Sequence, residues 1–125
     1  MSKRNLLNQV SAAPVAKVER RLREIRITGL CAADGSGTMA DQCQAALEQG
    51  RMLLEAEQLT MSDVTRVAYL ITDADEFSAC VPVFRRMFPQ MLPALTFTWA
   101  GSGTLSVPHA VIELAFYVER PEAFL

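Results

Sequence analysis

The chain has 125 residues, of which half are hydrophobic and 21% are charged, and its formal net charge at pH 7 is −2. This length predicts a single domain over residues 1–125, with a core that needs neither disulfides nor metals. No segment approaches the roughly 18 to 20 apolar residues of a membrane span, and the N-terminal apolar stretch is too short for a secretory signal, so we expect a cytoplasmic protein without a membrane partner. The high apolar fraction predicts that some surface is buried between subunits.

The cysteines and the histidine give no sign of a metal site. Cys31, Cys43 and Cys80 are odd in number and have no paired-ligand spacing, so we expect reduced, mostly buried thiols. A single histidine argues against a His-rich metal centre. We therefore predict neither a metal nor a cofactor.

Basic residues are concentrated near the N-terminus. Residues 1–26 contain seven of the twelve Lys and Arg residues but only two of the fourteen acidic residues. Such a segment can contact nucleic-acid phosphates, but it has no interleaved aromatic residue to stack on bases, and the whole chain is acidic. We interpret the charges as the solvated edge of a sheet and expect no nucleic-acid partner.

The first half of the chain predicts an arm, a hairpin and a helix. Residues 1–13 lack periodicity and are expected to form a flexible arm, whereas apolar and polar residues alternate in the second half of a predicted hairpin over residues 15–28. Thr38 followed by Asp41 approximates the start of a helix. Apolar residues at helical spacing continue that helix to Leu54, for about four turns.

A strand and a second helix follow. Residues 64–72 are rich in β-branched and aromatic side chains, which favours a strand. Residues 73–88 show helical spacing of their apolar side chains, and the helix is expected to begin at Asp73. Pro82 lies inside this pattern, where it removes a backbone hydrogen bond at a cost of about 3 kcal/mol, so we predict a kink near it.

The last two predicted strands each have one apolar face. In residues 95–99 bulky apolar residues alternate with threonines, and in residues 111–118 one alternating set is wholly apolar while the other contains Glu113. A carboxylate on a central strand is costly to bury unless it is hydrogen-bonded, and it can orient or deprotonate a water molecule. Glu113 is therefore the best candidate catalytic residue. The alternative is a structural glutamate bonded to backbone or to an arginine at a subunit interface.

The order of elements is two strands, a helix, a strand, a helix and two strands. It predicts an α+β sandwich with one mostly antiparallel sheet and both helices on the same face. The other face must then be solvated or covered by another subunit.

This order, together with several short motifs, resembles the Rid family, the YjgF-like reactive-intermediate deaminases, over most of the chain. The motifs are Gly29, Gln42, Asp63-Val64, the segment YLITDADEF, Phe88-Pro89, Pro93-Ala94, Pro108 and Glu113. The resemblance implies a chorismate-mutase-like fold and a homotrimer whose sheets form a central barrel. It also implies ligand clefts between neighbouring subunits.

Active deaminases of this family hydrolyse enamine and imine intermediates to keto acids and ammonia without a metal or organic cofactor. The resemblance implies that Glu113 helps to place the attacking water. The usual Pro-Ala-Arg motif is Pro93, Ala94 and Leu95 here. Leucine offers neither charge nor donors to a substrate carboxylate, and losing one charge-assisted hydrogen bond costs about 1.5 to 3 kcal/mol.

The cleft residues that the resemblance implies around Glu113 are Thr28, Gly29, Phe88, Leu95 and Phe97. Because Leu95 and Phe97 make one wall apolar, a partly apolar ligand is favoured. We therefore predict a divergent Rid-like protein that binds a small, partly apolar metabolite in clefts between subunits, with its catalytic activity left open.

Two alternatives remain. One is a hydrolase, an enamine or imine deaminase in which Arg26 or Arg66 replaces the missing arginine. The other is an RNA-binding or endoribonuclease-like translation inhibitor, a function for which the family has also been named. The acidic composition argues against the second alternative.

Overall fold

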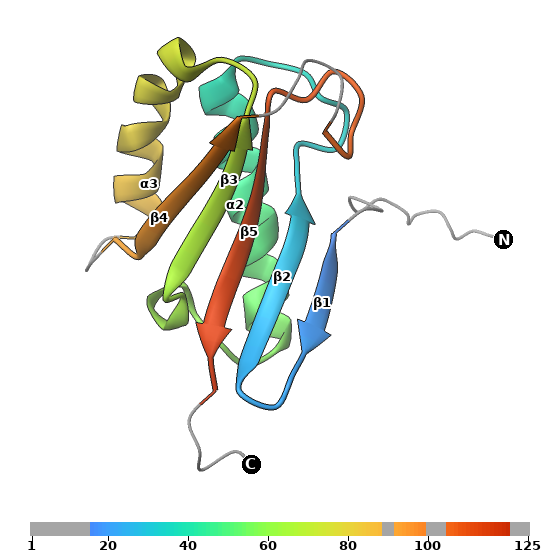
Figure 1. The fold of residues 1–125 in the computed structure, drawn as a ribbon, viewed down its shortest axis with the longest axis vertical. Coiled ribbons are helices and arrows are strands. Elements are labelled where there is room, and N and C mark those ends of the chain that lie inside the picture. Colours follow the sequence, from blue (N-terminus) through green and yellow to red (C-terminus); the bar gives the residue numbers. More distant parts are fainter. Residues whose placement is uncertain (1–15, 89–91, 100–104, 121–125) are drawn as a thin grey trace, which may run out of the picture.

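The computed structural model describes residues 16–88, 92–99 and 105–120, so the predicted arm at residues 1–13 lies outside the described residues. One five-stranded sheet has its helices on one side (Figure 1). In chain order the elements are β1 (Lys17–Arg20), β2 (Glu24–Leu30), α2 (Met39–Ala56), the 3₁₀ segment η1 (Met61–Asp63), β3 (Arg66–Ile71), the 3₁₀ segment η2 (Ala74–Cys80), α3 (Val81–Met87), β4 (Ala94–Trp99) and β5 (Ile112–Glu119).

The strand order is β1-β2-β5-β3-β4, so the last strand in the chain occupies the centre of the sheet. β5 pairs antiparallel with both β2 and β3, and β1 pairs antiparallel with β2. Only β3 and β4 are parallel among the described strands, and η2 and α3 form the crossover between them. The predicted mostly antiparallel α+β sheet is confirmed.

The predicted start of α2 is confirmed in atomic detail. The Asp41 N–H donates to Thr38 Oγ1 at 3.1 Å, and the Thr38 N–H donates to Asp41 Oδ2 at 3.1 Å. These bonds satisfy one amide of the first helical turn, that of Asp41, and the amide of the N-cap residue Thr38 itself. Further along, Gly50 lets α2 approach the sheet closely, because a Cβ there would lie 2.2 Å from a ring carbon of Phe116.

The prediction of one kinked helix over residues 73–88 was wrong in form. The segment is divided into the 3₁₀ turns of η2 and the α-helix α3, and Pro82 lies in the first turn of α3. The first amides of a helix have no partner within it, so a proline there removes no hydrogen bond. The chain therefore begins a new helix at Val81, with Pro82 in its first turn, instead of bending an existing one.

The core lies between the sheet and the helices, and the alternation predicted for β5 is confirmed. Its apolar set is at most 3% exposed, and the set containing Glu113 is partly exposed. The three cysteines are free and buried, as predicted. Among the described residues, no helix is both long and apolar enough to cross a membrane.

Candidate functional site

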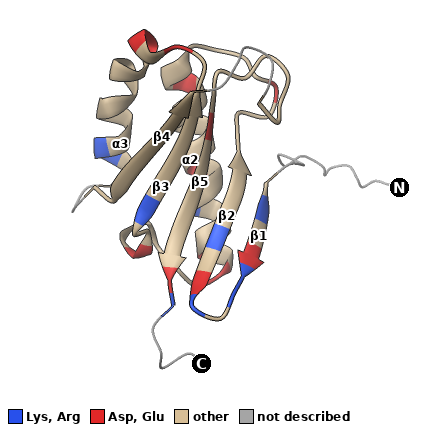
Figure 2. Cartoon of the chain, in the orientation of Figure 1, with Lys and Arg blue, Asp and Glu red and all other residues tan. Residues whose placement is uncertain are grey.

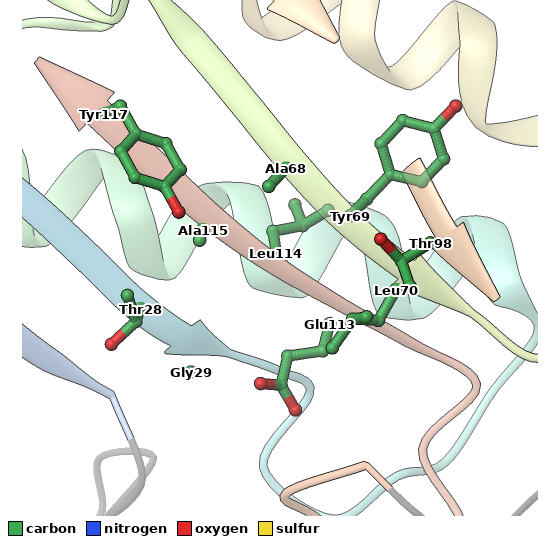
Figure 3. A pocket seen from close by; sticks show the side chains of 10 residues that line it. All are labelled: Thr28, Gly29, Ala68, Tyr69, Leu70, Thr98, Glu113, Leu114, Ala115 and Tyr117. Carbon is green, nitrogen blue, oxygen red and sulfur yellow. The ribbon is translucent and has the colours of Figure 1, made fainter. Parts of the chain in front are cut away.

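A cavity of about 270 Å³ lies on the face of the sheet opposite the helices, which we call the open face (Figure 3). Its centre is hollow because Ala68 of β3 pairs with Ala115 of β5, and both side chains are small. Leu70 is paired with Glu113 at one end. The lining residues are Thr28, Gly29, Ala68, Tyr69, Leu70, Thr98, Glu113, Leu114, Ala115 and Tyr117.

Glu113 is held through one of its two carboxylate oxygens. Oε1 accepts the Ser106 N–H at 2.9 Å and lies 3.6 Å from the Cys31 Sγ. Within the described part of the chain, Oε2 has no hydrogen-bond partner. Figure 3 shows the carboxylate extending from β5 toward the side of the cavity where Gly29 lies. The arrangement fixes the side chain and leaves one acceptor oxygen for a ligand or a water molecule.

The Cys31 thiol acts as a donor in this arrangement. Cys31 is 1% exposed, and burial, reinforced by the negative charge of Glu113, raises its pKa to about 12. The thiol therefore stays protonated at neutral pH and is a poor nucleophile. Its Sγ also lies 3.6 Å from the Ile112 carbonyl oxygen.

Gln42 of α2 fixes the segment that leads into β5. Its side chain is 1% exposed, and its Oε1 accepts the Val111 N–H at 2.9 Å. Its Nε2 donates to the carbonyl oxygens of Gly35 at 3.0 Å and Gly37 at 3.1 Å. Gln42 thus joins α2, the loop before it and the chain just before Glu113. The sequence signal for this role was an amide on the apolar face of a predicted helix.

A bulge at the end of β2 places Thr28 and Gly29 beside the cavity. The register with β5 shifts between Ile27 and Leu30, and Gly29 has φ of 74°. This left-handed conformation is strained for other residues but not for glycine. The structure thereby brings Glu113, Thr28 and Gly29 together at one cavity, and their role in ligand binding stays a prediction.

Leu95 and Phe97 lie on the helix-covered side of the sheet, not on the open face. The Phe97 ring centroid is 5.7 Å from that of Tyr69, which stacks on Phe77 at 4.3 Å. Because β4 is an edge strand, Leu95 and Phe97 are still 39% and 46% exposed. Within one chain they do not share a site with Glu113, so a cleft containing all three requires a second copy of the chain.

Phe88 belongs to the core. It is 4% exposed, and its ring centroid lies 6.3 Å from that of Phe84 and 6.1 Å from that of Phe116. It does not line the open-face cavity. Its role in ligand binding stays a prediction.

The two arginines proposed as substitutes both lie near Tyr117, whose ring lines the cavity. The guanidinium carbon of Arg66 is 3.7 Å from the Tyr117 ring centroid, and that of Arg26 is 5.7 Å away. Figure 2 shows basic segments on β2 and β3 and an acidic segment further up β5. Arg26 pairs with Glu24 at 2.6 Å, which raises the pKa of Arg26. Arg66 has the weaker polar contact of the two, a hydrogen bond of 3.4 Å to Thr96 Oγ1.

Comparison with known proteins supports the family resemblance. No family model matches the chain. Mitochondrial Mmf2 of Schizosaccharomyces pombe is 30% identical over 78 residues, which is 62% of this chain and 62% of Mmf2. Rv2704 of Mycobacterium tuberculosis, a YjgF/YER057c/UK114 family member, has 21% identity and a TM-score of 0.67, with 78% of this chain and 79% of that chain covered. RidA from an Antarctic Psychrobacter has 15% identity and a TM-score of 0.71, with 89% of this chain and 92% of that chain covered.

The resemblance to the Rid family is confirmed. The chain has the chorismate-mutase-like fold of these structures, a sheet of five strands with two helices. The name of Mmf2 places that relative in mitochondria. The cytoplasmic location expected for this Rid-like chain therefore stays a prediction.

Proposed function

We propose that this Rid-like chain binds a small, partly apolar metabolite on the open face of its sheet. The observation that carries the proposal is the Glu113 carboxylate, which is anchored through Oε1 with Oε2 unoccupied by any described residue, at the end of an apolar hollow. Small-molecule sites in proteins commonly combine apolar walls with a few fixed polar groups.

The size of the hollow fits a metabolite better than a macromolecule. Its volume of about 270 Å³ is just below the roughly 300–1,000 Å³ of typical ligand pockets. Leu70, Ala68 and Ala115 supply apolar surface, and burying such surface contributes about 25 cal/mol per Å². Glu113 then orients the ligand by accepting a hydrogen bond.

We also propose that the chain acts as a homotrimer in which a neighbouring copy completes each cleft. On β4, Leu95, Phe97 and Trp99 are 39%, 46% and 59% exposed, so they form an apolar strip on an edge strand of the sheet. Exposed apolar patches of this kind commonly mark interfaces. A neighbouring copy of the strip at the open face would place Leu95 and Phe97 near Glu113. Sedimentation velocity should give a trimer that Phe97→Asp dissociates, and a monomeric wild-type chain would contradict this assembly.

A thermal-shift screen against keto acids, amino acids and aromatic acids tests the binding proposal. A ligand should raise the unfolding midpoint of the wild-type chain, because it binds only the folded state. The shift should shrink in Glu113→Gln. Glu119→Gln, which changes a carboxylate on the same strand outside this cavity, should leave it unchanged. A shift unaffected by Glu113→Gln would place the ligand elsewhere.

The second candidate is hydrolysis of an imine, which the unoccupied Oε2 favours. In this step Oε2 takes a proton from water as the water oxygen bonds to the imine carbon and the nitrogen takes up a proton. That proton comes from solvent. Oε2 then returns its proton to the amine nitrogen of the resulting carbinolamine, the C–N bond breaks to release ammonia, and the hydroxyl proton passes to solvent, which leaves a keto acid. A positioned general base typically contributes about 10²- to 10⁴-fold. Glu113→Gln should therefore reduce ammonia release from a freshly generated imine by at least about 10²-fold, and unchanged release would exclude this role.

A further inference from the structure

We infer that Arg66 recognises the anionic group of the ligand, and that the ligand is a monocarboxylate with an apolar segment longer than three carbons. This inference rests on the proposed open-face site and specifies its ligand. The carboxylate would bind at the Arg66 end of the cavity, and the rest of the molecule would extend over the hollow toward Glu113.

The first observation is that Arg66 has an unused charge. Among the residues that the structure describes, no carboxylate lies within ion-pair distance of its guanidinium. Its polar contact is Thr96 Oγ1, at 3.4 Å from Nη1. Arg26 on the same face is paired with Glu24. Arg66 is thus a partly buried cation on the sheet surface with donors available to an anion.

The second observation is the way in which Arg66 is held. Its guanidinium carbon lies over the Tyr117 ring, 3.7 Å from the centroid, so the aromatic face restrains the guanidinium plane. Contact through the face leaves N–H donors at the edge, and these match the two oxygens of a carboxylate. Stacking therefore orders the arginine without using the donors that an anion needs.

The third observation is the spacing along the strands. Arg66 pairs with Tyr117, Ala68 with Ala115 and Leu70 with Glu113, so the cationic and carboxylate ends are separated by one pair of alanines. Four residues along an antiparallel strand span about 13 Å. A three-carbon acid covers little of this distance. An acid with a longer aliphatic or aromatic segment can reach from Arg66 to Glu113 and place that segment over Ala68 and Ala115.

Calorimetric titration of the purified chain with 2-ketooctanoate tests the inference. Pyruvate, the methyl ester of 2-ketooctanoate and inorganic phosphate serve as comparison ligands. We expect 2-ketooctanoate to bind more tightly than pyruvate, and phosphate to bind weakly because it lacks the apolar segment. Arg66→Gln should weaken binding of 2-ketooctanoate about 10- to 100-fold and leave binding of the uncharged ester unchanged, since only the acid uses the guanidinium.

Two further variants separate recognition from folding. Arg66→Lys keeps the charge without the planar fork, so it should lose less affinity than Arg66→Gln. Arg26→Gln is the matched control, and it should not change binding because Glu24 already holds that guanidinium. Equal loss of affinity for the acid and the ester in Arg66→Gln would assign Arg66 a structural role and overturn the inference.

The outcomes also distinguish this inference from the proposed function. If a ligand of the thermal-shift screen gives a shift that depends on Glu113 while Arg66→Gln leaves binding of 2-ketooctanoate unchanged, the site stands and the assignment of Arg66 fails. If the wild-type chain binds neither the acids nor the ester, both fail. Pyruvate binding as tightly as 2-ketooctanoate would overturn the predicted chain length alone.

Discussion

The two faces of the sheet use the same strands in different ways. On the face covered by the helices, alternate residues of β5 are at most 3% exposed and pack in the core. On the open face, the residues between them include Glu113, Ala115 and Tyr117, which are partly exposed and line the cavity. The comparison teaches that the covered face supplies stability while the open face is available for chemistry, so substitutions on neighbouring residues should have separable effects.

The sharpest test of this difference uses two adjacent aromatic residues of β5. Phe116 is fully buried against the helices, and Tyr117 faces the cavity. Phe116→Ala should lower the free energy of unfolding by about 3–5 kcal/mol, because it removes apolar contacts and leaves a void. Tyr117→Ala should cost about 1 kcal/mol or less, mainly through its contact with Arg66. Urea denaturation measures both, and equal losses would contradict the comparison.

A smaller effect is expected where α2 touches the covered face. Gly50→Ala places a methyl group 2.2 Å from the Phe116 ring, so the helix or the ring must shift. We expect a loss of about 1–3 kcal/mol in unfolding free energy. In a Phe116→Leu background the same change should cost less, because the ring that it meets is absent. If the loss of unfolding free energy in the double variant equalled the sum of the losses in the two single variants, the two residues would not compete for this space.

The smallest effect is expected at Cys31, a buried residue that contacts the open face through Glu113. Its thiol has a pKa of about 12 in the folded chain against about 8.5 in the unfolded chain. The contribution of the protonated thiol to the free energy of unfolding is therefore complete below pH 8.5 and is lost as the pH rises toward 12. Relative to Cys31→Ser, the wild-type chain should lose about 1 kcal/mol between pH 7 and pH 9. Parallel stability curves for the two chains would contradict the buried, protonated thiol.

The sequence was most informative where local rules and burial agree. The start of α2 at Thr38 and the alternation of β5 were both predicted, because a capping pair and a two-residue period are local signals. The arrangement around Pro82 was missed, because the same apolar spacing fits either a kinked helix or a new helix that has the proline in its first turn.

The site was predictable only in part for a different reason. Glu113 was identified because a lone carboxylate interrupts an apolar strand pattern. The anchoring of its Oε1 depends on Cys31, which is distant in sequence, and on the backbone N–H of Ser106, whose direction is set by the loop before β5 and not by residue type. Alternation likewise placed Leu95 and Phe97 on one face of β4, but only the pairing with β3 shows which face that is.

The central position of β5 has a consequence for how the chain folds. β5 is the last of the five strands to be synthesised, yet it lies between β2 and β3 and pairs with both. Until it is present, β2 and β3 have no common partner, and their apolar faces cannot form a continuous layer. Such contacts between distant parts of a chain slow folding. We therefore expect the sheet to assemble only after β5 has left the ribosome, with the nascent chain dependent until then on protection from aggregation.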